Sequence, residues 1–215
     1  MTLAPVKTPV VAKKMFPNYI WDIPTQEKVI YLTFDDGPTP EITNFVLKEL
    51  KKYSAKATFF CIGKNIKNHP EIFKQIIDDN HSIGNHTQNH LNGWKTKTQD
   101  YISNTLEVER TLQLYNFKTL KLKLFRPPYG KIKRKQAKIL LEKGYKIIMW
   151  SVLSGDFDTN LSKEKCLQNV LKHTCKGSIV VFHDSKKAYE KVKYVLPKVL
   201  DYLSKEGYEF KAINS

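Results

Sequence analysis

The chain has 215 residues, enough for a single domain with one hydrophobic core. Its 41% hydrophobic and 12% aromatic residues exclude general disorder, although 27% of the residues are charged. The net charge of +15 comes from lysines scattered along the chain, so we expect it to serve mainly solubility. Steering of an anionic partner is the alternative, and no specific nucleic-acid binding is expected.

The N-terminus lacks the apolar core of a signal peptide, and no run approaches the ~20 apolar residues of a membrane-spanning helix. We therefore expect a cytoplasmic protein, or a secreted or periplasmic one if a signal peptide has been removed, and we expect a monomer. The three cysteines, Cys61, Cys166 and Cys175, are too widely spaced for a disulfide framework or a thiolate metal site.

Apolar, β-branched runs alternate with helical patterns along most of the chain. Residues 1–27 are expected to form an irregular lead to one folded domain at 28–215. Strands are expected at 29–34, 56–61, 81–84, 122–125, 145–152, 178–182 and 208–213. Helices are expected at 41–53, 70–79, 98–115, 131–143, 162–173 and 189–204. Repeated βα units imply a parallel sheet, and seven in succession favour closure into an α/β barrel.

Ionisable residues follow the C-terminal ends of five different predicted strands. They are Asp35 and Asp36, His86, Arg126, Asp156 and His183. In an α/β barrel those strand ends share one face, and that face carries the active site. Each residue also has an ordinary structural explanation, such as a turn, a salt bridge at the rim or a solvent-facing side chain. Their joint placement nevertheless predicts a functional site.

Asp36, His86 and His90 have the composition of a metal site. If residues 86–90 form a helical turn, the two histidines lie on one face and can clamp a cation beside Asp36. Imidazole with carboxylate suits Zn²⁺, with Co²⁺, Ni²⁺ and Mn²⁺ as alternatives. Three protein ligands leave positions open for water and substrate, as in catalytic zinc sites.

Two further residues can move protons at such a site. Asp35 can take a proton from the attacking water, and His183 can give one to the leaving group. Arg126 is expected to pair with Asp35 and aim it, and Asp156 to pair with His183 and hold its tautomer. The other histidines, His69, His81 and His173, are expected to be non-catalytic.

The same residues, in this order, resemble the polysaccharide deacetylase family, which is carbohydrate esterase family 4 with its NodB-homology domain. The resemblance runs from about residue 29 to residue 213. Residues 33–38 (TFDDGP) match the family segment that supplies the base and a metal ligand, and residues 86–90 (HTQNH) match its H-[S/T]-x-x-H metal segment. Residues 126–129 (RPPY) match R-x-P-Y, and residues 181–183 (VFH) match L-x-H with Val for Leu.

The resemblance implies a distorted (β/α)₇ barrel with the catalytic domain at 28–215, acting on a glycan. It implies that the Tyr129 backbone N–H binds the oxyanion and that Tyr129, Pro128 and Phe157 contact substrate. The segment around Asp156 departs from the family pattern, with Leu153 for an aspartate and Phe157 for a tryptophan. The expected reaction is N-deacetylation of an amino-sugar glycan of chitooligosaccharide or peptidoglycan type. O-deacetylation of a xylan-type glycan and a non-catalytic carbohydrate-binding role are the alternatives.

Overall fold

The computed structural model describes residues 5–115 and 123–214. Their core is one curled sheet of nine strands whose ladders are all parallel, in the order β1-β6-β5-β4-β3-β2-β8-β7, with β9 also pairing with β2. The strands are β1 (Tyr19–Ile20), β2 (Val29–Asp35), β3 (Thr58–Cys61), β4 (Ser82–Asn85), β5 (Leu124–Phe125), β6 (Lys146–Ile148), β7 (Val152–Leu153), β8 (Ile179–His183) and β9 (Glu209–Phe210).

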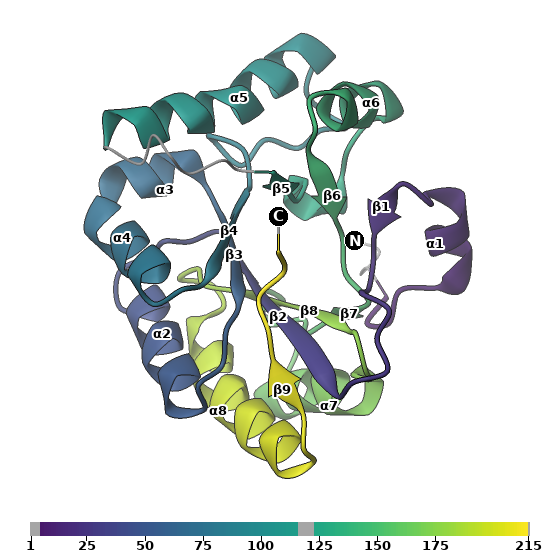
Figure 1. The fold of residues 1–215 in the computed structure, drawn as a ribbon, viewed down its shortest axis with the longest axis vertical. Coiled ribbons are helices and arrows are strands. Elements are labelled where there is room, and N and C mark those ends of the chain that lie inside the picture. Colours follow the sequence, from purple (N-terminus) through teal and green to yellow (C-terminus); the bar gives the residue numbers. More distant parts are fainter. Residues whose placement is uncertain (1–4, 116–122, 215) are drawn as a thin grey trace.

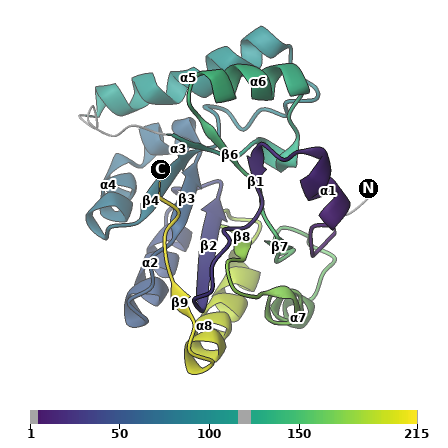
Figure 2. The ribbon, with the colours of Figure 1, turned by 45° about the vertical axis from the view of Figure 1, so that its right-hand side comes forward.

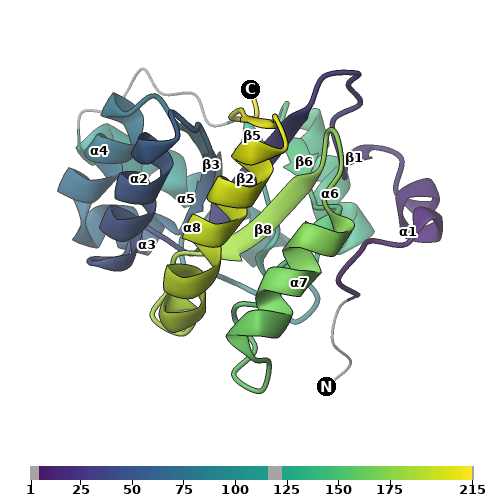
Figure 3. The same cartoon turned by 90° about the horizontal axis from the view of Figure 1, so that it is seen from below.

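Helices form an outer ring around this sheet (Figure 1). They are α1 (Val10–Met15), α2 (Ile42–Lys52), α3 (Gly63–Asn68), α4 (Pro70–Asp78), α5 (Thr98–Leu114), α6 (Arg134–Glu142), α7 (Lys163–His173) and α8 (Tyr189–Lys205), with a 3₁₀ turn at Pro128–Gly130. α5 and α6 lie side by side over one part of the sheet (Figure 2), and α7 and α8 over another (Figure 3). The architecture confirms a single-domain, distorted α/β barrel.

The longest strand is β2, which pairs with β3, β8 and β9. Its sequence, VIYLTFD, is almost wholly buried, as expected for a parallel strand with both faces covered. The largest apolar cluster lies on the outer side, where β2, β3 and β8 meet α2, α4, α7 and α8. A smaller cluster contains Phe60, Leu124 and Ile213, and the Ile213 N–H donates to Thr58 Oγ1. The C-terminal segment thus packs against residues of β3 and β5.

The expected strand at 145–152 is wrong as a single element. The structure divides it into β6, which pairs with β5, and β7, which pairs with β8 at the other end of the strand order. Between them the Ser151 N–H donates to the Ile179 carbonyl, so the chain has already changed partners. Apolar content alone predicted one run, because a change of pairing partner leaves no mark on hydropathy.

The lead is more ordered than expected, because it contains α1 and β1. The lead pairs with both β6 and β7, which lie near opposite ends of the strand order. Tyr19–Ile20 pairs with β6, and Lys7 forms an antiparallel bridge to Val152 in β7. Helix α3 was not expected either. Residues 1–4, residue 122 of an expected strand, and residue 215 of the expected domain lie outside the described residues.

Candidate active site

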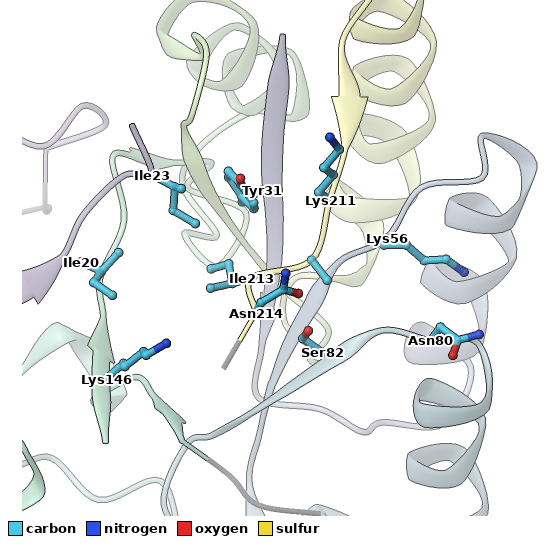
Figure 4. Close-up of a pocket in the computed structure, with 11 residues that line it drawn as sticks. Ile20, Ile23, Tyr31, Lys56, Asn80, Ser82, Lys146, Lys211, Ile213 and Asn214 are labelled. Carbon is cyan, nitrogen blue, oxygen red and sulfur yellow. The ribbon is translucent and has the colours of Figure 1, made fainter. Parts of the chain in front are cut away.

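The barrel has a hollow at each end, and they differ in chemistry. The hollow at the N-terminal ends of the strands, about 590 Å³, is lined by Lys56, Lys146 and Lys211 around Ile213 (Figure 4). No carboxylate or imidazole occurs among its described lining residues. The hollow at the opposite end, about 730 Å³, contains Asp36 and His90. The groups that can bind metal and transfer protons therefore gather where the strands end.

The two adjacent aspartates diverge because the backbone turns between them. Asp35 is the last residue of β2, and Asp36 has a left-handed backbone with φ of 86°. The alternation of a regular strand is broken there, so the two carboxylates meet different partners. Asp35 is buried against Arg126, with 2.7 Å between Oδ1 and Nη1, whereas Asp36 lies beside the histidines.

Asp184 holds this turn in place. Its Oδ1 accepts the Gly37 N–H at 2.8 Å, its Oδ2 accepts the Thr43 hydroxyl at 2.6 Å, and its own N–H donates to the Asp35 carbonyl. A Cβ on Gly37 would lie 1.9 Å from Asp184 Oδ2, so this position excludes any side chain. Asp184 is not among the site residues predicted from the sequence, although an acidic residue directly follows His183.

Arg126 is fully buried and held on several sides. Its guanidinium carbon lies 4.1 Å from the centre of the Phe60 ring. It donates to the carbonyls of Ile148 and Met149 and to Thr33 Oγ1, as well as to Asp35. Burial lowers its pKa from the ordinary value, and the Asp35 carboxylate opposes that shift. A cation fixed this firmly sets the position of the carboxylate that pairs with it.

The expected metal ligands do come together. His90 Nε2 lies 3.2 Å and His86 Nε2 3.8 Å from Asp36 Oδ1, and the three potential ligand atoms lie within 4.8 Å of one another. The expectation of a helical turn at 86–90 is wrong, however. Thr87 and His90 have left-handed backbones, with φ of 64° and 55°, and the Thr87 N–H donates to Asn85 Oδ1. The loop after β4 brings the imidazole rings of His86 and His90 together without forming a helical turn.

The chemistry of these three groups fits a divalent cation. Oδ1 of Asp36 is buried and accepts no hydrogen bond within the described part of the chain. Burial disfavours its charge, but contact with His90 and the nearby His183 and His86 outweigh this and hold the pKa of Asp36 well below its ordinary value. An ionised oxygen without a hydrogen-bond donor is the kind of atom that a cation satisfies.

The ring of His86 has the protonation state and the orientation of a potential metal ligand. Burial lowers its pKa to about 4, so the imidazole is neutral near pH 7. Its Nδ1 lies 2.8 Å from the Arg126 carbonyl, which can only accept, so Nδ1 carries the proton. The lone pair is then on Nε2, which faces Asp36. This second partner fixes the tautomer, as is usual for histidines that bind metal.

His183 and Asp156 form a second, separate pair. Asp156 accepts from both the His183 ring and its backbone N–H, each at 2.7 Å. Burial opposes charge on the ring, but the Asp156 carboxylate, helped by the carboxylates of Asp36 and Asp35, outweighs it and raises the pKa of His183 to about 10. The ring is therefore an imidazolium at neutral pH. Phe157 packs edge-on against it, with the ring centres 5.1 Å apart.

Tyr129 contacts the site through its hydroxyl, whereas the family resemblance implied an oxyanion contact through its backbone N–H and a contact with substrate. It lies in the 3₁₀ turn, with φ of 61°, directly after Pro128, which is buried. Its hydroxyl lies 3.1 Å from His90 Nδ1, and the rings of the two residues are 4.5 Å apart. The phenol is thus a partner of a potential metal ligand.

The other histidines differ among themselves. His81 accepts the Ala57 N–H at Nδ1, and His173 Nδ1 lies 3.0 Å from the Asn169 carbonyl, which are structural contacts. His69 lines the same hollow as Asp36. Asn65, which was not singled out, donates to the Asp36 carbonyl at 2.7 Å.

An α/β barrel in which a carboxylate lies beside two imidazoles, with a second carboxylate and a His–Asp pair nearby, is typical of metal-dependent hydrolases. Comparison with known proteins narrows this class. Residues 22–148 match the family model described as polysaccharide deacetylase. A peptidoglycan-N-acetylglucosamine deacetylase of Bacillus cereus is 35% identical over 195 residues, covering 90% of each chain. A chitooligosaccharide deacetylase of Azorhizobium caulinodans is 32% identical over 162 residues, covering 75% of this chain and 76% of that protein.

A solved structure has the same fold. The crystal structure of the Bc1960 peptidoglycan N-acetylglucosamine deacetylase superposes with a TM-score of 0.84 at 31% identity, covering 96% of this chain and 95% of that one. The chain belongs to the polysaccharide deacetylase family, and it is an amide-hydrolysing deacetylase. No helix in the described ranges is long and apolar enough to cross a membrane.

Proposed function

We propose that this enzyme removes N-acetyl groups from an amino-sugar glycan with a divalent metal held by Asp36, His86 and His90. The observation that carries the proposal is Oδ1 of Asp36. This oxygen is buried, accepts no hydrogen bond from the described residues, and lies near two imidazole nitrogens. Two nitrogens and one carboxylate oxygen favour Zn²⁺, with Co²⁺, Ni²⁺ and Mn²⁺ as the other candidates. When bound, such a cation polarises the acetyl carbonyl and makes water a better nucleophile at neutral pH.

Asp35 is the proposed general base. Arg126 engages its Oδ1, which leaves the second oxygen to take a proton from the attacking water. Because the guanidinium is tied to two backbone carbonyls and a hydroxyl, Asp35 cannot swing away from the reacting atoms.

His183 is the proposed general acid. Its imidazolium donates a proton from Nε2 to the nitrogen of the breaking C–N bond, and the products are acetate and a free amino sugar. Asp156 holds Nδ1 and keeps the ring charged until that step. The Tyr129 backbone N–H is the proposed donor to the oxyanion, and Pro128 and Phe157 are proposed to border the sugar.

The proposed substrates are peptidoglycan and chitooligosaccharides, because proteins with those two activities in their names are similar over most of this chain. Action on peptidoglycan would place the enzyme outside the cytoplasmic membrane, the second of the two expected locations. A monomer remains a prediction, which light scattering after gel filtration would test.

Acetate release tests the proposal. Purified enzyme is stripped with a chelator and assayed on chitooligosaccharide, peptidoglycan fragments and acetylated xylan before and after adding each metal. We expect release from the first two substrates, loss on stripping, and recovery with Zn²⁺. The Asp35→Asn variant serves as the inactive control. Acetate release that is unchanged after chelator treatment would refute the metal mechanism. Acetate release from acetylated xylan alone would favour the esterase alternative.

A further inference from the structure

An exposed tryptophan lies in the loop between β4 and α5, the loop that also carries the proposed ligands His86 and His90. Trp94 follows the ligand His90 by four residues, and 61% of its surface is accessible. Its indole N–H is nevertheless held, donating to the Ile132 carbonyl at 3.2 Å. A large aromatic ring that is exposed yet fixed in orientation costs energy in water and offers a flat face to a ligand.

Two loop segments form a stiff support for this ring. We call residues 91–97 and 129–136, together, the Trp94 shelf. The Gly93 N–H donates to the Lys131 carbonyl at 3.1 Å, and Gln136 Nε2 donates to the Gly93 carbonyl at 2.9 Å. A Cβ on Gly93 would lie 2.4 Å from the Lys131 carbonyl oxygen, so the close approach requires glycine.

Tyr129 joins the shelf to the site. It lies on the second segment, and its hydroxyl is 3.1 Å from His90 Nδ1. Tyr129 is itself 59% exposed. The Trp94 shelf therefore carries two exposed aromatic side chains, and one of them, Tyr129, contacts a proposed metal ligand.

The shelf is also strongly basic. The ammonium of Lys131 lies 5.3 Å from the centre of the Trp94 ring. The shelf carries no Asp or Glu, and its cations are Lys95, Lys97, Lys131, Lys133, Arg134 and Lys135. Over the described ranges, none of these six forms an ion pair with a carboxylate, whereas other surface lysines such as Lys74 and Lys205 do. The Lys133 ammonium donates to the Thr96 carbonyl within the shelf, and among the described residues no carboxylate neutralises the charge of the other five.

We propose that the Trp94 shelf is a subsite for an acidic saccharide unit of the glycan. A sugar ring stacks on Trp94, and a carboxylate of the same unit pairs with Lys131. This inference rests on the proposed function and adds to it that the enzyme prefers an anionic glycan strand to a neutral one. It also gives part of the +15 net charge a local role.

The test compares one glycan in two charge states. Peptidoglycan fragments freed of their peptides, so that each muramic acid unit has a free carboxylate, are assayed as isolated and after those carboxylates have been converted to amides, which removes the charge and keeps the sugar. We expect Lys131→Gln to raise KM for the anionic fragment about two- to fivefold, the range of an exposed ion pair, and to leave KM for the amidated one unchanged. We expect Trp94→Ala to raise KM roughly tenfold for both fragments.

Lys163→Gln is the matched control. Lys163 also lies over an aromatic ring, 4.6 Å from the centre of Tyr194, but on α7. It should change neither KM. Raising the salt concentration should increase KM for the anionic fragment only, since salt screens exposed charges. Equal effects of Lys131→Gln on both fragments would overturn the role of Lys131, and an unchanged KM in Trp94→Ala would overturn the subsite.

Binding separates this inference from the proposed function. Calorimetric titration of the Asp35→Asn variant with the anionic fragment needs no turnover. If the wild-type enzyme releases no acetate but the fragment binds and loses affinity with Trp94→Ala, the reaction assignment fails and the subsite stands. If acetate is released and neither Lys131→Gln nor Trp94→Ala changes the binding affinity, the subsite fails and the reaction stands.

Discussion

Replacing Tyr129 by Phe removes the oxygen that lies 3.1 Å from His90 Nδ1 and keeps the ring and the backbone N–H. With a metal on Nε2, the Nδ1 proton of His90 would donate to this oxygen, which fixes the tautomer and the angle of the ring. Losing such a partner lowers metal affinity about 10- to 100-fold. The phenol is neutral and exposed, so we expect about tenfold, equal to about 1.4 kcal/mol.

Competition with a chromophoric chelator measures this affinity directly, without substrate. Tyr189→Phe is the matched control, because Tyr189 lines the hollow beside Asp36 and packs against Phe45. Its substitution should leave the metal Kd unchanged. An unchanged Kd in Tyr129→Phe would refute the reasoning, and so would an equal loss in both variants. Reduced activity with a normal metal Kd would assign the phenol to substrate contact instead.

Three further predictions concern the site and the stability of the fold. In Asp156→Asn, His183 loses the carboxylate that contributes most to raising its pKa to about 10. The activity of this variant should therefore fall at least about tenfold between pH 6 and pH 8. The wild-type enzyme should show no such drop. In Gly37→Ala, the new Cβ would meet Asp184 at 1.9 Å, so the free energy of unfolding in urea should fall by about 2 kcal/mol or more. Burial lowers the pKa of His81 from 6.5 to about 4. Between pH 6.5 and pH 4 the unfolded chain therefore binds more protons than the folded one. The free energy of unfolding should fall by up to about 3 kcal/mol as the pH drops through that window. His81→Asn should flatten this dependence, and an unchanged slope would contradict the assignment.

The order of strands and helices could be predicted because their signals are local. The run at 29–34 became β2, and helices 98–115 and 162–173 became α5 and α7 within a residue or two. The Ser162 hydroxyl accepts the Lys165 N–H, as a capping residue should. Burial and capping both act within a few residues, so the chain itself carries them. Strand pairing depends on residues that are far apart in the sequence. For this reason neither the division of residues 145–152 into two strands nor the pairing of the N-terminal lead with β6 and β7 was predicted.

The sequence by itself determined which residue types end each strand, and an α/β barrel brings such ends to one face. That was enough to expect Asp36, His86 and His90 as neighbours. Their exact convergence was decided in three dimensions, by left-handed backbones at Asp36, Thr87 and His90 and not by a helical turn. The partners that aim them were decided there too, because Asp184, the Tyr129 phenol and the Arg126 carbonyl reach the site from distant parts of the chain. Spacing along a chain records local geometry, whereas the direction of a side chain depends on the whole fold.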